Sequence, residues 1–414
     1  MIARGTVVNV RSGAVDLSIA PLAAGTNVRI ACRGGWKHGS ITSAANGIAT
    51  ATLSGNADGI VSGAYAEEGA AETIVLGTAA LGRAIDACGQ PLDGDAPLCG
   101  VRIRFAMPRI APSERIALDA PMWTGVRAID ALLTIGRGAR VGLFGAPGAG
   151  KSTLLETIAG GTCADAIVVA LVGERGREAE QWIARRDQRT TVVCATSDRP
   201  ARERVAAARA AFAHARALAR RGLHVLLILD SLARVAYALR EDRAGEPAGR
   251  GGYPPSVFAD LAQFVESAGA FTRGSVSLLA TVLSDGDERD PVSEAARSLL
   301  DGHIELSQEL AHAGRFPAID LLASASRTMA AVTAPEHQRA AARIRAAFAA
   351  LAASEDLRSV GIEPRDPEAV AAIAHERRLE ALVRQERAPV HPRHSLAMLL
   401  ETADTLGEPD EHRF

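Results

Sequence analysis

The sequence is poor in lysine. Of its 46 basic residues only Lys37 and Lys151 are lysine, and all the others are arginine. The excess of arginine, like that of alanine, is attributed to genomic base composition rather than to function. A lysine kept at residue 151 therefore indicates a position with a steric demand, because an ammonium is a compact point charge and a guanidinium is a broad planar fork.

Cysteine is also scarce, and its pattern excludes two classes of small-protein architecture. The five cysteines are scattered, and no C-x-x-C pair is present. We therefore expect neither a disulfide framework nor a cysteine metal site, and a reducing cytoplasm is the predicted location. The first residues, MIARGTVVNV, lack the charged-then-apolar order of a signal peptide.

Long apolar runs and an excess of one charge are missing as well. The strongest runs, such as Val225–Leu229, are far shorter than the roughly 20 residues of a membrane-spanning helix. The formal net charge of −2 gives no basic field for nucleic acid. With 414 residues, 48% of them hydrophobic, the chain has enough material for two or three domains with a sizeable core. A soluble globular protein is predicted.

The first region, residues 1–73, has the pattern of a small β domain. Val15, Leu17 and Ile19 alternate with small or polar residues, and further short strands are expected at Val28–Cys32 and Ile48–Leu53. Glycine-bearing turns separate these segments. A small barrel or sandwich fits this pattern.

Residues 74–330 show continuous apolar strands that alternate with helical segments such as Ala201–Arg221. This pattern predicts an α/β core with a parallel sheet covered on both faces. The remaining residues, 331–414, are predicted to form a helical domain. The expected strands are Val141–Phe144, Ile167–Val172, Thr191–Ala195, Val225–Leu229 and Val276–Leu283, and the expected C-terminal helices are Pro335–Ala353, Asp366–Gln385 and His394–Leu406.

The stretch GAPGAGKST matches the phosphate-binding pattern G-x-x-x-x-G-K-[ST], and it follows a strand and precedes a helix. Glycines let backbone N–H groups turn around an anion, and the helix N-terminus adds its dipole. Lys151 is expected to reach the β- and γ-phosphates of ATP, and Ser152 to offer a hydroxyl to Mg²⁺. The predicted nucleotide-binding residues of the loop are Gly145, Ala146, Pro147, Gly148, Ala149, Gly150, Lys151, Ser152 and Thr153.

Two acidic residues follow later strands of the same core. Asp230 ends the run VLLILD, which is the form of a Walker B strand whose aspartate holds Mg²⁺. Glu174 ends the run AIVVALVGE, where a carboxylate can polarise a water that attacks the γ-phosphate. For Glu174 an alternative remains open: Glu174, Arg175, Arg177 and Glu178 can simply pair with one another in a solvated loop.

The motifs in this order resemble those of type III secretion and flagellar export ATPases, which are relatives of the catalytic subunit of the rotary ATP synthase. The resemblance covers most of residues 76–330 and implies a RecA-like P-loop ATPase core. It rests on GAPGAGKST, ALVGERGRE, LLILDSLAR, GGYPPSVFADL, SLLDGHIELS and RFPAIDLLASASR.

The resemblance also implies roles for single residues. Glu174 is expected to be the catalytic base, and Arg175 to lie near the γ-phosphate. Arg327 matches the arginine finger that enters the site of the neighbouring subunit. Phe316 falls where the family usually has a tyrosine against the adenine, and the ring face does the stacking. Arg234 is a weaker candidate for organising the site.

The implied assembly is a ring of identical subunits, expected to be a hexamer, that works in the cytoplasm at the base of an inner-membrane export apparatus. Its expected partners are stator or stalk proteins and chaperone–substrate complexes, and membrane contact is expected only through such partners. A virulence-type secretion system is favoured over a flagellum. A rotary ATP synthase-like subunit, a Rho-like RNA translocase and a nucleotide-binding scaffold without turnover are the other hypotheses.

Overall fold

The computed structural model describes residues 2–11, 13–23, 25–33, 35–53, 57–69, 73–100, 102–104, 107, 110–243, 245–283 and 290–406. Contacts divide the chain into two compact units, each built from separate stretches of sequence. One unit consists of Met1–Pro108, Ala170–His214 and Arg234–Pro247, and the other of Arg109–Val169, Ala215–Ala233 and Ala248–Phe414.

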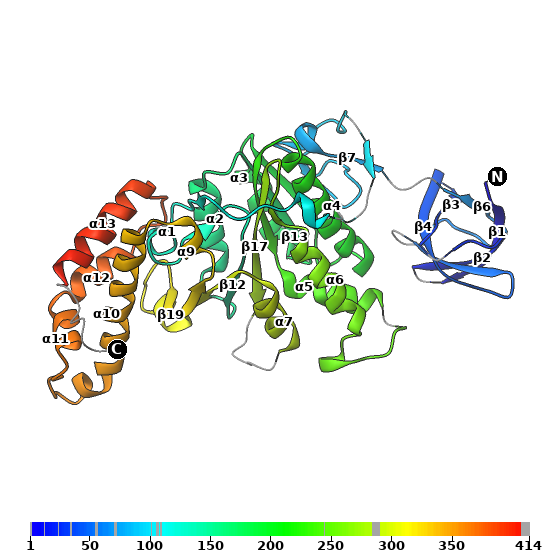
Figure 1. Cartoon of the computed structure of the whole chain (residues 1–414). Coiled ribbons are helices and arrows are strands. Elements are labelled where there is room, and N and C mark those ends of the chain that lie inside the picture. Colours follow the sequence, from blue (N-terminus) through cyan, green and yellow to red (C-terminus); the bar gives the residue numbers. More distant parts are fainter. Residues whose placement is uncertain are drawn as a thin grey trace. The chain divides into compact units, whose positions relative to one another are not determined.

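The N-terminal strands form a closed six-stranded barrel, as expected for the first region (Figure 1). Alternation explains its core, because Val15 and Leu17 are fully buried while their neighbours face outward. The strands are β1 (Arg4–Arg11), β2 (Ala14–Ile19), β3 (Asn27–Cys32), β4 (Gly35–Ala45), β5 (Ile48–Leu53) and β6 (Tyr65–Glu68). The sequence had not predicted β4, since its residues lack a regular apolar alternation; its pairing with β3 and β5 supplies the order.

The α/β core contains a nine-stranded sheet with the order β19-β18-β12-β17-β15-β13-β14-β8, and β16 pairs with β17 beside this path. Each of the five strands expected from apolar runs is present in it. The bounds are β8 (Ala84–Ile85), β12 (Arg140–Gly145), β13 (Ala166–Val172), β14 (Thr190–Ala195), β15 (His224–Asp230), β16 (Gly269–Ala270), β17 (Ser275–Leu283), β18 (Gly302–Leu306) and β19 (Ile319–Ser326).

The central strands are buried along their whole length, which explains their unbroken apolar sequences. Every residue of β13 and of β15 is buried. The expectation of a parallel sheet holds for β12, β15, β17 and β18. The edge strand β19, which is not among the apolar runs, runs antiparallel to β18.

Helices connect the strands of the core, and small two-stranded sheets flank them. The helices are α1 (Arg127–Leu132), α2 (Lys151–Gly161), α3 (Gly176–Arg185), α4 (Ala201–Ala219), α5 (Leu232–Asp242), α6 (Pro255–Glu266), α7 (Pro291–Leu299), α8 (Gln308–His312) and α9 (Met329–Val332). The small sheets pair β7 (Thr73–Val75) with β9 (Arg102–Arg104), and β10 (Pro121–Met122) with β11 (Ile135–Gly136).

The C-terminal region is helical, as predicted, and its helices α10 to α13 pack together and against α1 (Figure 1). Their bounds are α10 (Pro335–Ser359), α11 (Pro367–Ala374), α12 (Glu376–Val383) and α13 (Pro392–Thr405). The single helix expected at Asp366–Gln385 is wrong: the backbone leaves helical geometry at His375, with φ −110° and ψ 11°. Among the described residues, no helix combines the length and apolar character of a membrane span.

Candidate active site

The phosphate-binding loop lies between β12 and α2, as the motif predicts. Three of its glycines have positive φ: Gly145 at 153°, Gly148 at 85° and Gly150 at 92°. No heavy atom would meet a Cβ at Gly148 or Gly150, so these two positions need glycine for backbone geometry and not for space. Gly150 is the N-cap of α2, and no acidic residue lies in the first turn of that helix. The helix N-terminus is therefore electrostatically suited to an anion.

Lys151 is the first residue of α2, and its ammonium turns back into the loop. Its Nζ donates hydrogen bonds to the carbonyl oxygens of Gly145, at 2.6 Å, and Ala146, at 2.8 Å. A compact ammonium can satisfy both carbonyls at once within the curve of the loop, which a planar guanidinium on a longer side chain fits poorly. Ser152 follows it and is exposed. Gln308 of α8 donates to the carbonyl of Pro147 at 2.9 Å and so fixes the tip of the loop.

Asp230 is the last residue of β15, as the Walker B pattern predicts. Only 9% of Asp230 is exposed, and its Oδ1 accepts a hydrogen bond of 2.6 Å from the hydroxyl of Thr281 on β17. This bond orients the carboxylate without neutralising it, since a hydroxyl is an uncharged donor. Asp230 therefore has the properties of an oriented oxygen ligand for a divalent cation.

Glu174 follows β13 and is 5% exposed. Its Oε1 lies 2.6 Å from Nε of Arg234 on α5, and Nη1 of the same arginine donates to the carbonyl of Gly173 at 2.8 Å. The Ser197 N–H donates to the carbonyl of Glu174 at 3.0 Å. Backbone and side chain of Glu174 are thus both held, and Arg234, a weaker candidate from the sequence, is the residue that orients it. Arg175 beside it is exposed.

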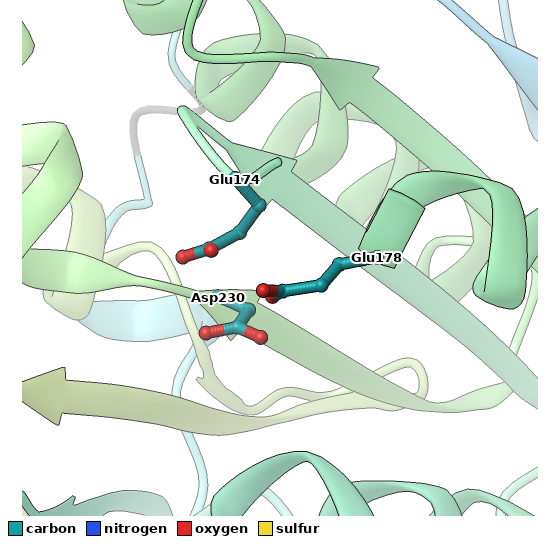
Figure 2. A group of neighbouring side chains, drawn as sticks. All are labelled: Glu174, Glu178 and Asp230. Atoms are coloured by element: carbon teal, nitrogen blue, oxygen red, sulfur yellow. The ribbon is translucent and has the colours of Figure 1, made fainter. Parts of the chain in front are cut away.

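The carboxylates of Glu174, Glu178 and Asp230 converge, as Figure 2 shows, and one oxygen of each lies within 4.8 Å of the others. Glu178 belongs to the first turn of α3. From the sequence, Glu178 is expected only as a possible partner in ion pairs of a solvated loop. Its i+4 spacing from Glu174, across a strand end and a helix start, was the available signal. Oxygen ligands of this kind suit Mg²⁺.

Phe316 and Arg327 lie near opposite ends of strand β12. In the strand register, Gly145 of β12 pairs with Leu306 of β18, which pairs with Ile319 of β19. The half-buried Phe316 belongs to the connection between Leu306 and Ile319, and so lies at the end of the sheet that carries the phosphate-binding loop. Gln308, in the same connection, contacts that loop directly.

Arg327 follows the last residue of β19 and is exposed. At this end Val141 of β12 pairs with Gly302 of β18, and Gly302 pairs with Ser326. Four residues of extended strand separate Val141 from Gly145, or about 13 Å at 3.3 Å per residue. This distance exceeds the span of an arginine side chain. The geometry therefore separates Arg327 from the phosphate-binding loop of its own chain.

Comparison with known proteins finds similar sequences and structures. Residues 125–326 match the model of the ATP synthase alpha/beta family, nucleotide-binding domain. A type 3 secretion system ATPase of Pseudomonas syringae pv. syringae is 42% identical over 373 residues, which cover 86% of this chain and 83% of the relative. A flagellum-specific ATP synthase of Salmonella typhimurium is 42% identical over 344 residues, covering 80% of this chain and 74% of the relative.

Among solved structures, the chain is similar to the assembled ATPase EscN from the type III secretion system of enteropathogenic E. coli. The TM-score is 0.88 at 35% identity, and the match covers 96% of this chain and 100% of that one. EscN has also been solved in complex with its central stalk EscO, with the same TM-score and 34% identity.

Proposed function

The chain belongs to the family of type 3 secretion system ATPases and is an ATP hydrolase of protein export, and we propose that it works as a ring of identical subunits, six in number. The observation that carries this proposal is the position of Arg327 at the far end of β12 from Lys151. In a closed ring with head-to-tail interfaces, Arg327 of each subunit can enter the nucleotide site of the next subunit.

In the proposed reaction the loop Gly145–Thr153 binds the phosphates of ATP through its N–H groups, and Lys151 neutralises the β- and γ-phosphates. Glu174 accepts a proton from the attacking water, and the lone pair of the water oxygen forms a bond to the γ-phosphorus. The bond from the γ-phosphorus to the bridging oxygen breaks, and ADP and inorganic phosphate are the products. Arg175 lies beside this base and faces the γ-phosphate. Phe316 stacks on the adenine.

Mg²⁺ fits the oxygen groups present, namely the Ser152 hydroxyl and the Asp230 carboxylate, with Glu178 as a further acid nearby. When bound, the ion would neutralise charge on the β- and γ-phosphate oxygens. The residues of the chain itself supply orientation: Thr281 directs the Asp230 carboxylate, and Arg234 directs Glu174.

Arg327 is proposed to complete the site of the neighbouring subunit by neutralising charge that develops on the γ-phosphoryl oxygens. Such a finger contributes on the order of 10³-fold or more to the rate. Hydrolysis coupled to this ring is proposed to release chaperones from export substrates and unfold them, with a stalk protein as partner, as in the EscN–EscO complex. The location is the cytoplasmic face of an inner-membrane apparatus.

A flagellar export ATPase is the second candidate, since a flagellum-specific relative reaches 42% identity. The virulence-type assignment is favoured because several similar relatives are type 3 secretion system ATPases, and that of Xanthomonas euvesicatoria is 44% identical over 307 residues. Deleting the gene separates the two: loss of effector secretion with intact motility supports the first, and loss of motility the second.

The central test of the chemistry is Glu174→Gln, which keeps the size of the side chain and removes the base. Hydrolysis is expected to fall by on the order of 10²-fold or more, while a fluorescent ATP analogue still binds with unchanged affinity. Assembly is tested on the wild type by diluting it: specific activity should fall together with the ring fraction in light scattering. Unchanged turnover of Glu174→Gln removes Glu174 from the mechanism.

A further inference from the structure

Asp301 connects three strands at the end of the core sheet where Arg327 lies. Its N–H donates to the carbonyl of Arg140 at 2.7 Å, and its own carbonyl accepts the Arg327 N–H at 3.0 Å. Arg140 is the first residue of β12, the strand that leads to the phosphate-binding loop. Asp301 immediately precedes β18. Its backbone therefore joins the start of the loop-bearing strand to the backbone of the proposed finger.

The side chain of Asp301 fixes this arrangement through Arg140. Its Oδ2 accepts from both the backbone N–H and the Nε of Arg140, each at 2.9 Å, and its Oδ1 accepts from Nη2 at 3.0 Å. This two-oxygen contact with a planar guanidinium allows one orientation of the carboxylate. The Arg140 side chain is 18% exposed and that of Asp301 26%, so solvent competes only partly for these bonds.

A second carboxylate holds Arg140 from another side. Oε1 of Glu266 lies 2.6 Å from Nη1 of Arg140, and Oε2 of Glu266 lies 3.0 Å from Nη2 of Arg115. Burial lowers the pKa of Arg140, but the hydrogen bond and the charge of Asp301, together with Glu266, outweigh it and raise the pKa overall. Arg140 is therefore a fixed, permanently charged anchor for Asp301.

We infer that Asp301 is a positioning residue for Arg327. The inference rests on the proposed role of Arg327 as the finger for a neighbouring site. The Arg327 side chain is exposed, so the placement of its backbone decides where the guanidinium can reach. A displacement of about 1 Å at a reacting centre can cost on the order of 10²-fold in rate. Asp301 sets this placement and ties it to the strand that holds the subunit's own nucleotide.

The first experiment is Asp301→Asn, which preserves size and the backbone carbonyl but turns an amide N–H₂ toward the Arg140 fork. We expect kcat to fall by roughly 10-fold while KM for ATP changes by less than about two-fold, because the loop at the other end of β12 is untouched. The matched control, Glu266→Gln, removes the other carboxylate from the same arginine and should leave kcat within about two-fold of the wild type.

The second experiment mixes subunits, because a finger acts on the neighbour and not on its own chain. Glu174→Gln subunits cannot hydrolyse ATP but carry an intact Arg327 and Asp301. When Glu174→Gln subunits are added in excess, the hydrolysis rate per Asp301→Asn subunit should be several-fold higher than that of Asp301→Asn subunits alone. A loss confined to the variant's own site or to its folding would not be restored by such neighbours.

The outcomes distinguish the positioning role of Asp301 from the proposed action of Arg327 on a neighbouring subunit. If Arg327→Ala subunits are not rescued by Glu174→Gln subunits, the finger in trans is wrong. If they are rescued and Asp301→Asn subunits are not, or if Asp301→Asn has wild-type kcat, only the inference is overturned. It is likewise overturned if Asp301→Asn lowers kcat further in an Arg327→Ala background. Should Asp301→Asn not fold, Arg140→Lys keeps the charge, loses the two-oxygen contact, and takes its place with the same expectations.

Discussion

The two ends of strand β12 hold different kinds of chemistry. At the Gly145 end lie glycines with positive φ and the Lys151 ammonium, the groups proposed to bind phosphate. At the Arg140 end, Asp301 and Glu266 hold the Arg140 side chain, and the exposed Arg327 follows the edge strand β19. The first end carries the groups proposed to bind the nucleotide of the same subunit. The second end carries an arginine that lies far from that nucleotide.

This difference separates binding from turnover. The groups proposed to hold ATP all belong to one subunit, so the affinity for ATP is expected to survive dilution. Arg327, which is expected to stabilise the transition state, lies too far along the sheet to reach the site of its own subunit. Turnover is therefore expected to need a neighbouring subunit. Changes at the two ends of β12 should therefore have separable effects on KM and kcat.

The largest expected effect comes from Arg327→Ala. We expect kcat to fall on the order of 10³-fold with KM for ATP nearly unchanged, because the lost charge acts only in the transition state. Steady-state hydrolysis at a protein concentration that keeps the ring assembled measures both constants. A rise in KM as large as the fall in kcat would mean that Arg327 binds ATP in the ground state. The two ends of β12 would then not differ in function.

The next effect is expected from Lys151→Arg, which keeps the charge and changes its shape. Hydrolysis should fall by on the order of 10²-fold, and nucleotide affinity should fall with it, since the guanidinium does not fit the curve of the loop. Titration with a fluorescent ATP analogue measures the affinity. Lys37→Arg on the barrel strand β4 is the matched control and should match the wild type; near-normal activity of Lys151→Arg would contradict the steric argument.

A smaller effect is expected from Phe316→Ala. Loss of the stacking ring should raise KM for ATP by up to roughly 10-fold and leave kcat within a few-fold. Phe316→Tyr restores the ring face and should behave like the wild type. Equal KM values for all three forms would show that the ring does not contact the base.

The smallest effect concerns stability at the end of the sheet away from the loop. His224 begins β15 and is 3% exposed, and burial, followed by the charge of Arg137, lowers its pKa to about 4. Its folded-state pKa lies below the unfolded value, so its contribution to stability is present above about pH 6.5 and is lost as the pH falls toward 4. From pH 7 to 5 the wild type should lose about 2 kcal/mol more unfolding free energy than His224→Gln.

Urea unfolding at the two pH values measures this difference. Nucleotide affinity at each pH should be the same in both proteins, because Asp230, at the other end of β15, is unchanged. An equal loss of stability in wild type and variant would mean that the pKa of His224 is the same in the folded and the unfolded protein.

Much of the core and its site could be predicted because the signals are local. The loop motif, the strand ending in Asp230 and the strand before Glu174 each combine an apolar run with a defined residue at its end, and the structure has these elements where expected. The division into residues 1–73, 74–330 and 331–414 stays a prediction, and so do the roles of Arg175, Phe316 and Arg327.

What escaped prediction depends on contacts between distant residues. Strand β4 exists because β3 and β5 pair with it, and its own residues alternate poorly. The antiparallel direction of β19 depends on its pairing with β18, which no periodicity in the sequence records. Arg234 and Thr281 reach their acids from elements 60 and 51 residues away along the chain, respectively, so spacing alone gives no sign of either contact.

The direction of β19 has a consequence for when the enzyme works. A parallel edge strand would bring the residue after it to the same end as the phosphate-binding loop, and every free subunit would carry its complete set of charged groups. The reversed strand delivers Arg327 elsewhere. Under the proposed assembly, a subunit outside the ring hydrolyses ATP only slowly, so formation of the ring also sets when ATP is consumed.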